Sequence, residues 1–133
     1  MRSIIETPFY IISAEVSDET PSVNKQRTRD LRTLLKILEL GIKEVESRHE
    51  ETIKAAFVVV CDKAQAIGIG RSFGQESILQ VDLFRTASLI HLRGEWKGQS
   101  LDIGTWKAVK ESVSINSPAW TYDPKTRTYY AAV

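Results

Sequence analysis

The stretch AAFVVVCDKAQAIGIGRSFGQESILQVD, which runs from Ala55 to Asp82, decides the fold that the sequence predicts. It opens with an unbroken apolar run, Ala55–Cys61, that is too short to span a membrane and is typical of a strand buried on both faces. Asp62 follows as a helix N-cap, and Gln65 stands three residues later, as in a capping box. The stretch therefore begins as a buried strand that leads into a capped helix.

The second half of the stretch completes a strand–helix–strand unit. Small residues such as Ala66 and Gly70 give the helix a face that can approach a sheet closely. Gly74 is suited to end the helix in a left-handed conformation, and Ser77–Val81 has the pattern of a second strand. The glycines of Gly68–Gly74 resemble a dinucleotide-binding loop only superficially, because they fall within the helix, and we interpret them as packing residues.

The flanking sequence supplies the remaining elements. Thr20 and Pro21 suit the start of a helix, whose apolar spacing continues to Leu38 and which Gly41 is expected to end. Asp102–Lys110 fits either a short helix or an irregular connection. Strands are expected over Phe9–Val16, Ile42–Ser47, Thr52–Cys61 and Thr86–Leu92, turns over Arg48–Glu51 and Gly94–Gly98, and a closing hairpin over Trp120–Tyr122 and Thr128–Ala131.

The order of these elements predicts a fold class. The first six run strand, helix, strand, strand, helix, strand, which with right-handed crossovers gives an α+β, ferredoxin-like βαββαβ sandwich with extra C-terminal strands. Two helices would cover one face of this sheet. The other face needs cover from the C-terminal aromatic residues or from a partner subunit, so we expect a homo-oligomer. Residues 1–133 are expected to form a single domain.

Composition excludes several classes of protein. Apolar residues make up 42% of the chain and charged residues 26%, as in an ordinary soluble domain. Lys and Arg number 18 against 17 acidic residues, so neither a nucleic acid nor a membrane is an expected partner. One cysteine, Cys61, lies inside the apolar run and is interpreted as a small core residue. With no signal-like or membrane-spanning segment, a cytoplasmic protein is expected.

No self-sufficient catalytic motif is visible. The histidines, His49 and His91, lie far apart, and neither has a Cys or Asp at a metal-ligand spacing, so no metal and no other cofactor is expected. The glutamates around the expected hairpin fit a solvated turn, or else one carboxylate faces a pocket and binds a cationic or polar ligand. These glutamates are Glu44, Glu46, Glu50 and Glu51.

Two further places have open interpretations. Arg27 lies on the apolar side of the first helix, where it either packs its stem at the edge of the core or contacts a ligand or an interface. Gln75 and Glu76 end the second helix directly before a strand, a position where loops often bind ligands, although a plain turn is the alternative.

Short segments in the same order along almost the whole chain are similar to one known family. They are YIISA at Tyr10–Ala14, VNKQRTRDLRTLL with Val23, Asn24 and Arg27, VES at Val45–Ser47, DKAQA at Asp62–Ala66, QESILQV at Gln75–Val81, and WTYDPKTRTYY at Trp120–Tyr130. On these segments the sequence resembles the small phage-encoded S-adenosylmethionine (SAM) lyases, long called SAM hydrolases. Members of that family disarm host restriction by destroying its methyl donor.

The resemblance implies a compact α/β subunit that assembles as a trimer, with SAM bound between neighbouring subunits. It also implies that SAM is cleaved to methylthioadenosine and homoserine lactone when the substrate's own carboxylate attacks its γ-carbon. The enzyme then mainly has to fold the substrate into the reactive conformation. Such a reaction suits a sequence without an obvious nucleophile or metal site.

One departure from the family concerns the glutamate that it places shortly before the apolar third strand, with a tyrosine in the preceding hairpin. Here the hairpin holds no tyrosine, and the direct match to the glutamate is Lys54, which would repel a sulfonium. Glu51 fits only if the alignment slips, and His49 is the nearby side chain that could replace the tyrosine. The resemblance thus assigns Glu51 and His49 as catalytic, and Arg27, Lys54, Gln75 and Glu76 as ligand-binding.

Two functions follow from these patterns. The first is a SAM lyase; the alternative is a non-catalytic protein of the same fold that sequesters SAM or a nucleotide defence signal. A carboxylate in the cleft would favour SAM chemistry, whereas Lys54 together with Arg27 would favour a phosphate-bearing ligand. The sequence does not fix the face that Lys54 takes, because a one-residue slip in register reverses it. An interaction module without a small-molecule site would leave the family-like segments unexplained.

Overall fold

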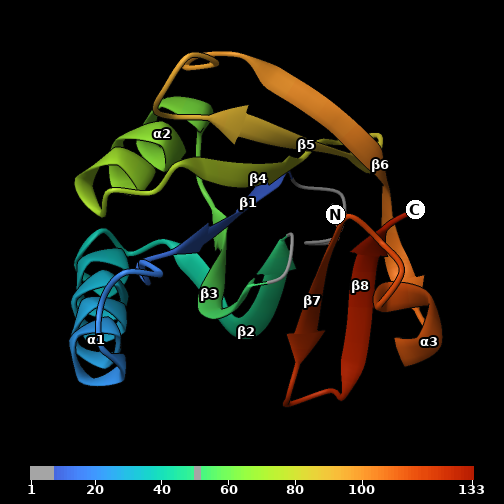
Figure 1. Cartoon of the computed structure of the whole chain (residues 1–133), viewed down its shortest axis with the longest axis horizontal. Helices are drawn as coiled ribbons and strands as arrows, with labels where there is room; N and C mark the ends of the chain where they lie inside the picture. Colours follow the sequence, from blue (N-terminus) through green and yellow to red (C-terminus); the bar gives the residue numbers. More distant parts are fainter. Residues whose placement is uncertain (1–7, 50–51) are drawn as a thin grey trace.

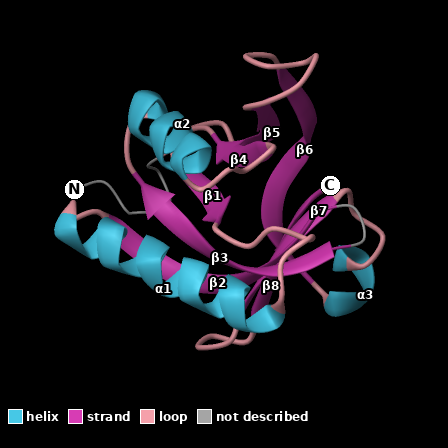
Figure 2. Ribbon diagram, turned by 60° about the vertical axis from the view of Figure 1, so that its left-hand side comes forward, coloured by secondary structure: helices cyan, strands magenta, loops and turns pink. Residues whose placement is uncertain are grey.

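The computed structural model describes residues 8–49 and 52–133, and its strands form a closed barrel (Figure 1). The elements are β1 (Phe9–Ser13), α1 (Pro21–Ile37), β2 (Gly41–His49), β3 (Thr52–Val60), α2 (Lys63–Ser72), β4 (Ser77–Val81), β5 (Thr86–His91), β6 (Ser100–Val109), α3 (Glu111–Ser114), β7 (Ala119–Asp123) and β8 (Thr128–Ala132). Helices α1 and α2 lie against the outside of the sheet beside β1 and β3, and α3 lies near β8 (Figure 2).

All neighbouring strands of the barrel are antiparallel. Around the barrel they follow the order β1-β3-β2-β7-β8-β6-β5-β4, and β4 pairs with β1 to complete the circle. Hairpins join β2 to β3, β4 to β5, β5 to β6 and β7 to β8. The other four pairings, β1 with β3, β1 with β4, β2 with β7 and β6 with β8, join strands that are not consecutive in the chain.

The prediction of a ferredoxin-like sandwich is wrong, because the sheet closes on itself. Strands β4, β1, β3 and β2 are neighbours in that order, but neither outer strand is an edge: β2 pairs with β7, and β4 pairs with β5. The segment that the sequence left open, Asp102–Lys110, lies mostly within β6, which links β5 to β8. The second face of the sheet is therefore covered by the C-terminal half of the same chain.

Closure explains the apolar character of β1, β3 and β4, which are buried on both faces. In β1, Tyr10 and Ile12 pack towards the helices with Leu31 and Leu35 of α1. Ile11, between them, joins a second cluster inside the barrel. That cluster also contains Val45, Ala56, Leu79, Val81, Ala87, Leu89, Trp106 and Ala132. Phe57 and Val59 of β3 belong to the outer cluster, so the expected two-sided burial of this strand is confirmed.

Local signals set the helix ends, as the sequence predicted. The hydroxyl of Thr20 accepts a hydrogen bond from the backbone N–H of Val23. Asp62 and Gln65 form the reciprocal capping box at the start of α2. Gly74 takes a left-handed conformation, with φ 66°, directly after this helix.

Several boundaries differ from the prediction. Strand β1 ends at Ser13, three residues before the expected Val16. Helix α1 ends at Ile37, and the left-handed turn after it is made by Glu39, with φ 55°, before Gly41, which was expected to end the helix. Gly41 instead begins β2. Arg48 and His49, expected in a turn, continue β2 because they pair with both β3 and β7.

Two glycines of α2 lie in contrasting surroundings. A Cβ atom added at Gly70 would meet Leu92 Cδ1 at 2.5 Å and Ile78 Cγ2 at 2.9 Å, so the helix sits directly on β4 and the residue after β5. A Cβ added at Gly68 would meet nothing within 4 Å. Of these two positions, only Gly70 must lack a side chain for the helix to pack as it does.

The pair gives a matched test of this packing. Gly70→Ala should lower the free energy of unfolding by about 1–3 kcal/mol, because Leu92 or the helix must move. Gly68→Ala should raise it by about 0.5–1 kcal/mol, because alanine has less backbone freedom to lose in a helix. Urea denaturation followed by circular dichroism measures both. Equal effects at the two positions would contradict the close approach at Gly70.

Candidate functional site

A cavity of about 560 Å³ opens at one end of the barrel. Its inner wall includes Ile11, Leu79 and Leu89, which lie side by side on adjacent strands. Two residues further along these strands, on the same face and nearer the opening, the side chains are polar. They include Ser13 of β1 and His91 of β5. The barrel interior therefore changes from apolar to polar as it reaches the cavity.

The register of β3 places Lys54 on the cavity side. Ala56 belongs to the interior cluster, and side chains alternate along a strand, so Lys54 and Thr52 share its face. On the neighbouring strand β2, Lys54 pairs with Ser47, and Thr52 pairs with His49. All four side chains line the cavity.

Charges of both signs surround the opening. The basic side chains are Arg48, Lys54 and Arg93, and the acidic ones are Glu15, Asp18 and Glu76; His49 and His91 also contribute. The side chain of Glu15 has a partner already, since Oε2 accepts a hydrogen bond from the backbone N–H of Ala55 at 2.5 Å. A ligand that itself carries both positive and negative groups would suit such a lining.

The structure brings most of the predicted site residues to this cavity. His49, Lys54, Gln75 and Glu76 line it, although they come from three separate segments of the chain. Glu51 lies outside the described residues, as does Glu50. Arg27 does not line the cavity but borders a different hollow, so the combination of Lys54 with Arg27 is not formed.

Two of the hairpin glutamates take other positions. Glu44 forms an ion pair with Arg32 of α1 at 2.5 Å, and Glu46 is exposed on the alternate face of β2. Sequence reasoning missed Glu15, Asp18 and Arg93. A signal for the first two existed, because a polar segment follows the apolar strand β1, which pairs with β3.

Three side chains hold the cavity wall formed by the segment after β1. The amide of Asn24 accepts from Val16 N at 2.9 Å and donates to Val16 O at 3.0 Å. Arg27 donates from Nε to Ala14 O at 2.6 Å and from Nη2 to Phe73 O. Gln75, which is 5% exposed, donates to Glu15 O at 3.1 Å. Arg27 and Gln75 therefore act on this wall through the backbone.

Neither a thiolate nor a metal cluster is found in the described chain. Burial, with a smaller contribution from Asp62, raises the pKa of Cys61 to about 11, so the thiol is protonated at neutral pH. Cys61 packs against the outer core cluster, as expected of a small core residue. Among residues 8–49 and 52–133, no three His, Cys, Asp or Glu side chains gather closely enough to hold a metal ion. No helix in these ranges is long and apolar enough to cross a membrane.

A family model, described as the S-Adenosylmethionine lyase family, matches residues 10–133. The chain belongs to the S-adenosylmethionine lyase family. The match covers every strand except the first residue of β1, together with all three helices. The resemblance drawn from the short sequence segments is thereby confirmed. A comparison with curated proteins found no match.

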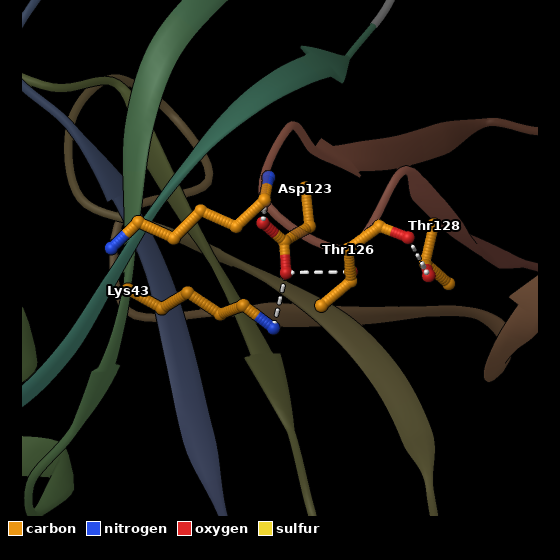
Figure 3. Close-up of polar contacts among 5 residues, drawn as sticks. Lys43, Asp123, Thr126 and Thr128 are labelled. Carbon is orange, nitrogen blue, oxygen red and sulfur yellow. Dashed lines mark hydrogen bonds and ion pairs between the residues drawn. The ribbon is translucent and has the colours of Figure 1, made fainter.

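In this SAM lyase family member, the C-terminal family-like segment has a structural role at Asp123. The carboxylate, 1% exposed, accepts from Thr126 Oγ1 at 2.8 Å and from Lys125 N at 3.0 Å, which fixes the β7–β8 turn (Figure 3). It also forms an ion pair with Lys43 Nζ at 2.5 Å (Figure 3). Since Lys43 belongs to β2, Asp123 ties the last hairpin to the strand that closes the barrel.

The ionised form of Asp123 is favoured in the folded protein. Burial opposes ionisation, but hydrogen bonds from Lys43, Thr126 and Lys125 outweigh it and hold the pKa of Asp123 below its ordinary value. A lowered pKa means that the carboxylate contributes stability above the pKa of the unfolded chain, about 4. That contribution is lost as the pH falls through the folded pKa.

We expect Asp123→Asn to lower the free energy of unfolding at pH 7 by about 1–3 kcal/mol, because the charged hydrogen bonds are lost. The difference from the wild type should shrink below about pH 4, where the wild-type carboxyl also becomes protonated. Denaturant unfolding at several pH values measures this dependence. Asp30→Asn, at an exposed carboxylate of α1, is the control. A difference that did not change with pH would argue against the ionic contribution.

Proposed function

We propose that this protein cleaves SAM to methylthioadenosine and homoserine lactone in the cavity at the end of the barrel. The observation that carries the proposal is that a chain of the SAM lyase family has a cavity of about 560 Å³ lined by side chains of both charges. SAM carries an ammonium, a carboxylate and a sulfonium group. Such a substrate needs negative and positive partners within one site.

The reaction needs little from the protein in the way of catalytic groups. A carboxylate oxygen of SAM forms a bond to its own γ-carbon, and the bond from that carbon to sulfur breaks. The electron pair stays on sulfur, so methylthioadenosine leaves as a neutral thioether and the amino acid portion becomes the lactone. No proton or water enters, and the carboxylate and sulfonium charges cancel. Holding the chain of the substrate in a bent conformation is then the main source of acceleration.

Glu51 and His49 are the residues that we propose to act closest to the sulfonium. Glu51 directly precedes Thr52, and both Thr52 and His49 line the cavity. Glu76 offers a further carboxylate in the lining, and Gln75 supports the wall. Lys54 faces the same space, where its ammonium would attract the carboxylate of SAM and repel the sulfonium.

The test is to incubate the purified protein with SAM and to follow methylthioadenosine and homoserine lactone by chromatography. Both products should form in equal amounts, and Glu51→Gln should reduce kcat/KM by at least about tenfold if its charge stabilises the reacting sulfonium. Glu44→Gln, at a glutamate that pairs with Arg32 instead of lining the cavity, is the matched control. Activity that survives Glu51→Gln would move the role to another carboxylate, with Glu76→Gln as the next variant.

The orientation of Lys54 favours one alternative, a binding protein that sequesters SAM or a nucleotide without cleaving it. The assay separates the two functions. Absence of products after prolonged incubation, together with calorimetric binding of SAM or an adenine nucleotide, would establish the alternative. Lys54→Glu sharpens the comparison: it should weaken binding of an anionic ligand strongly, whereas SAM, which carries charges of both signs, should be affected much less.

The same family resemblance supports a trimer in which neighbouring subunits complete the site, and a role in depleting the methyl donor of host restriction in the cytoplasm. The mass of the assembly in solution tests the trimer directly. Light scattering on the purified protein should give three times the 15.0 kDa of one chain. A monomeric mass at assay concentrations, with full activity, would show that one barrel suffices for the reaction.

A further inference from the structure

A second hollow, of about 520 Å³, lies at the C-terminal end of α2. Its walls come from three parts of the chain: Arg27 on α1, the segment Arg71–Gly74, and the residues after β5, which include Arg93 and Lys97. Gly74 and Arg93 also line the cavity at the barrel end, so the two spaces share a wall. Their linings differ in charge.

The charged residues that line this hollow are all basic. They are Arg27, Arg71, Arg93 and Lys97, and no Asp or Glu contributes to the lining. Glu95 stands between two of them in the sequence but is not part of the wall. Within the described residues the ion pairs are Arg32–Glu44 and Lys43–Asp123, so no described carboxylate pairs with these four cations. Positive side chains around one concave space repel one another, and an anion between them would relieve this repulsion.

Two carbonyl groups directly after α2 already accept hydrogen bonds from arginines, which reduces their repulsion of an anion in the hollow. Phe73 O accepts from Arg27, and Gly74 O accepts from Arg93 Nη1 at 3.3 Å. Arg27 is fixed in place, since its Nε also donates to Ala14 O. The side chains of Arg71 and Lys97, both exposed, make no hydrogen bond or ion pair with the described residues, so their donors are available to a ligand.

The geometry points to a binding site for a phosphate-bearing small molecule in this hollow, separate from the lyase cavity. Guanidinium groups bind phosphate oxygens through paired hydrogen bonds, and a lysine ammonium adds a point charge. Arg71 and Lys97 supply these contacts, and Arg93 contributes the donors that Gly74 O does not use. A space of this volume accepts a diphosphate, either free or as part of a nucleotide.

Calorimetric titration with sodium pyrophosphate and with ADP tests the site, in a buffer that contains no phosphate. Both should bind, with an affinity that falls as salt is added, whereas adenosine should not bind at the hollow. Similar affinities would identify the phosphate group as the whole determinant, and tighter binding of ADP would identify a nucleotide. Neither result depends on SAM cleavage, so the titrations test the phosphate site independently of the lyase activity.

The double substitution Arg71→Gln and Lys97→Gln should weaken binding of both probes at least about tenfold, because two charged hydrogen-bond donors are lost. The matched control is Lys107→Gln with Lys110→Gln, which removes the same charge from exposed positions outside the hollow. Lys97→Gln alone, in an exposed loop, serves if the double variant does not fold. The proposal is overturned if neither probe binds, or if the hollow and control variants lose affinity equally.

Discussion

The pairing of β2 with β7 is the contact that turns an open sheet into a barrel. It joins Glu46–His49 to Ala119–Tyr122, whose paired residues are 70 or more positions apart in the chain. Beyond the end of this short ladder, the Lys43–Asp123 ion pair joins the same two strands where their register no longer pairs them. Without the seam, β2 and β7 would each expose an unpaired edge, and the interior cluster around Trp106 would face solvent. The cavity exists because this seam closes one wall of it.

Closure also determines where polar side chains can gather. Inside the barrel, Ile11, Leu79 and Leu89 form an apolar layer. The next inward-facing residues along these strands lie at the opening, in contact with solvent. At that level, residues from different strands that are remote in the sequence, such as Ser13, Lys54 and His91, meet around one opening. The polar side chains of the site thus come from the ends of several different strands. This explains why no compact catalytic motif marks it in the sequence.

Features that depend on near neighbours in the chain could be predicted from the sequence. The Asp62 capping box, the left-handed Gly74 and the last hairpin follow from local chemistry, and each is found. The barrel could not be predicted in this way, because a sandwich and a barrel share the strand order β4-β1-β3-β2 and differ in what pairs with its two edges. The strand β6 gave no clear signal because its outward positions are exposed and polar, and Gly104, with φ 138°, interrupts its pattern at a bulge against β5.

Several residues of the family-like segments hold the backbone in place. Asn24 holds Val16 through two hydrogen bonds, and Arg27 joins Ala14 O, after β1, to Phe73 O, after α2. Asp123 holds the turn of the last hairpin through Lys125 and Thr126 and ties it to β2 through Lys43. A wall without regular structure needs such side chains, since its own N–H and C=O groups have no strand partner to fix them. A residue with several backbone contacts tolerates few replacements. A short motif can therefore identify a family by the residues that hold its backbone in place, even where those residues do not line the cavity themselves, as with Asn24 and Arg27.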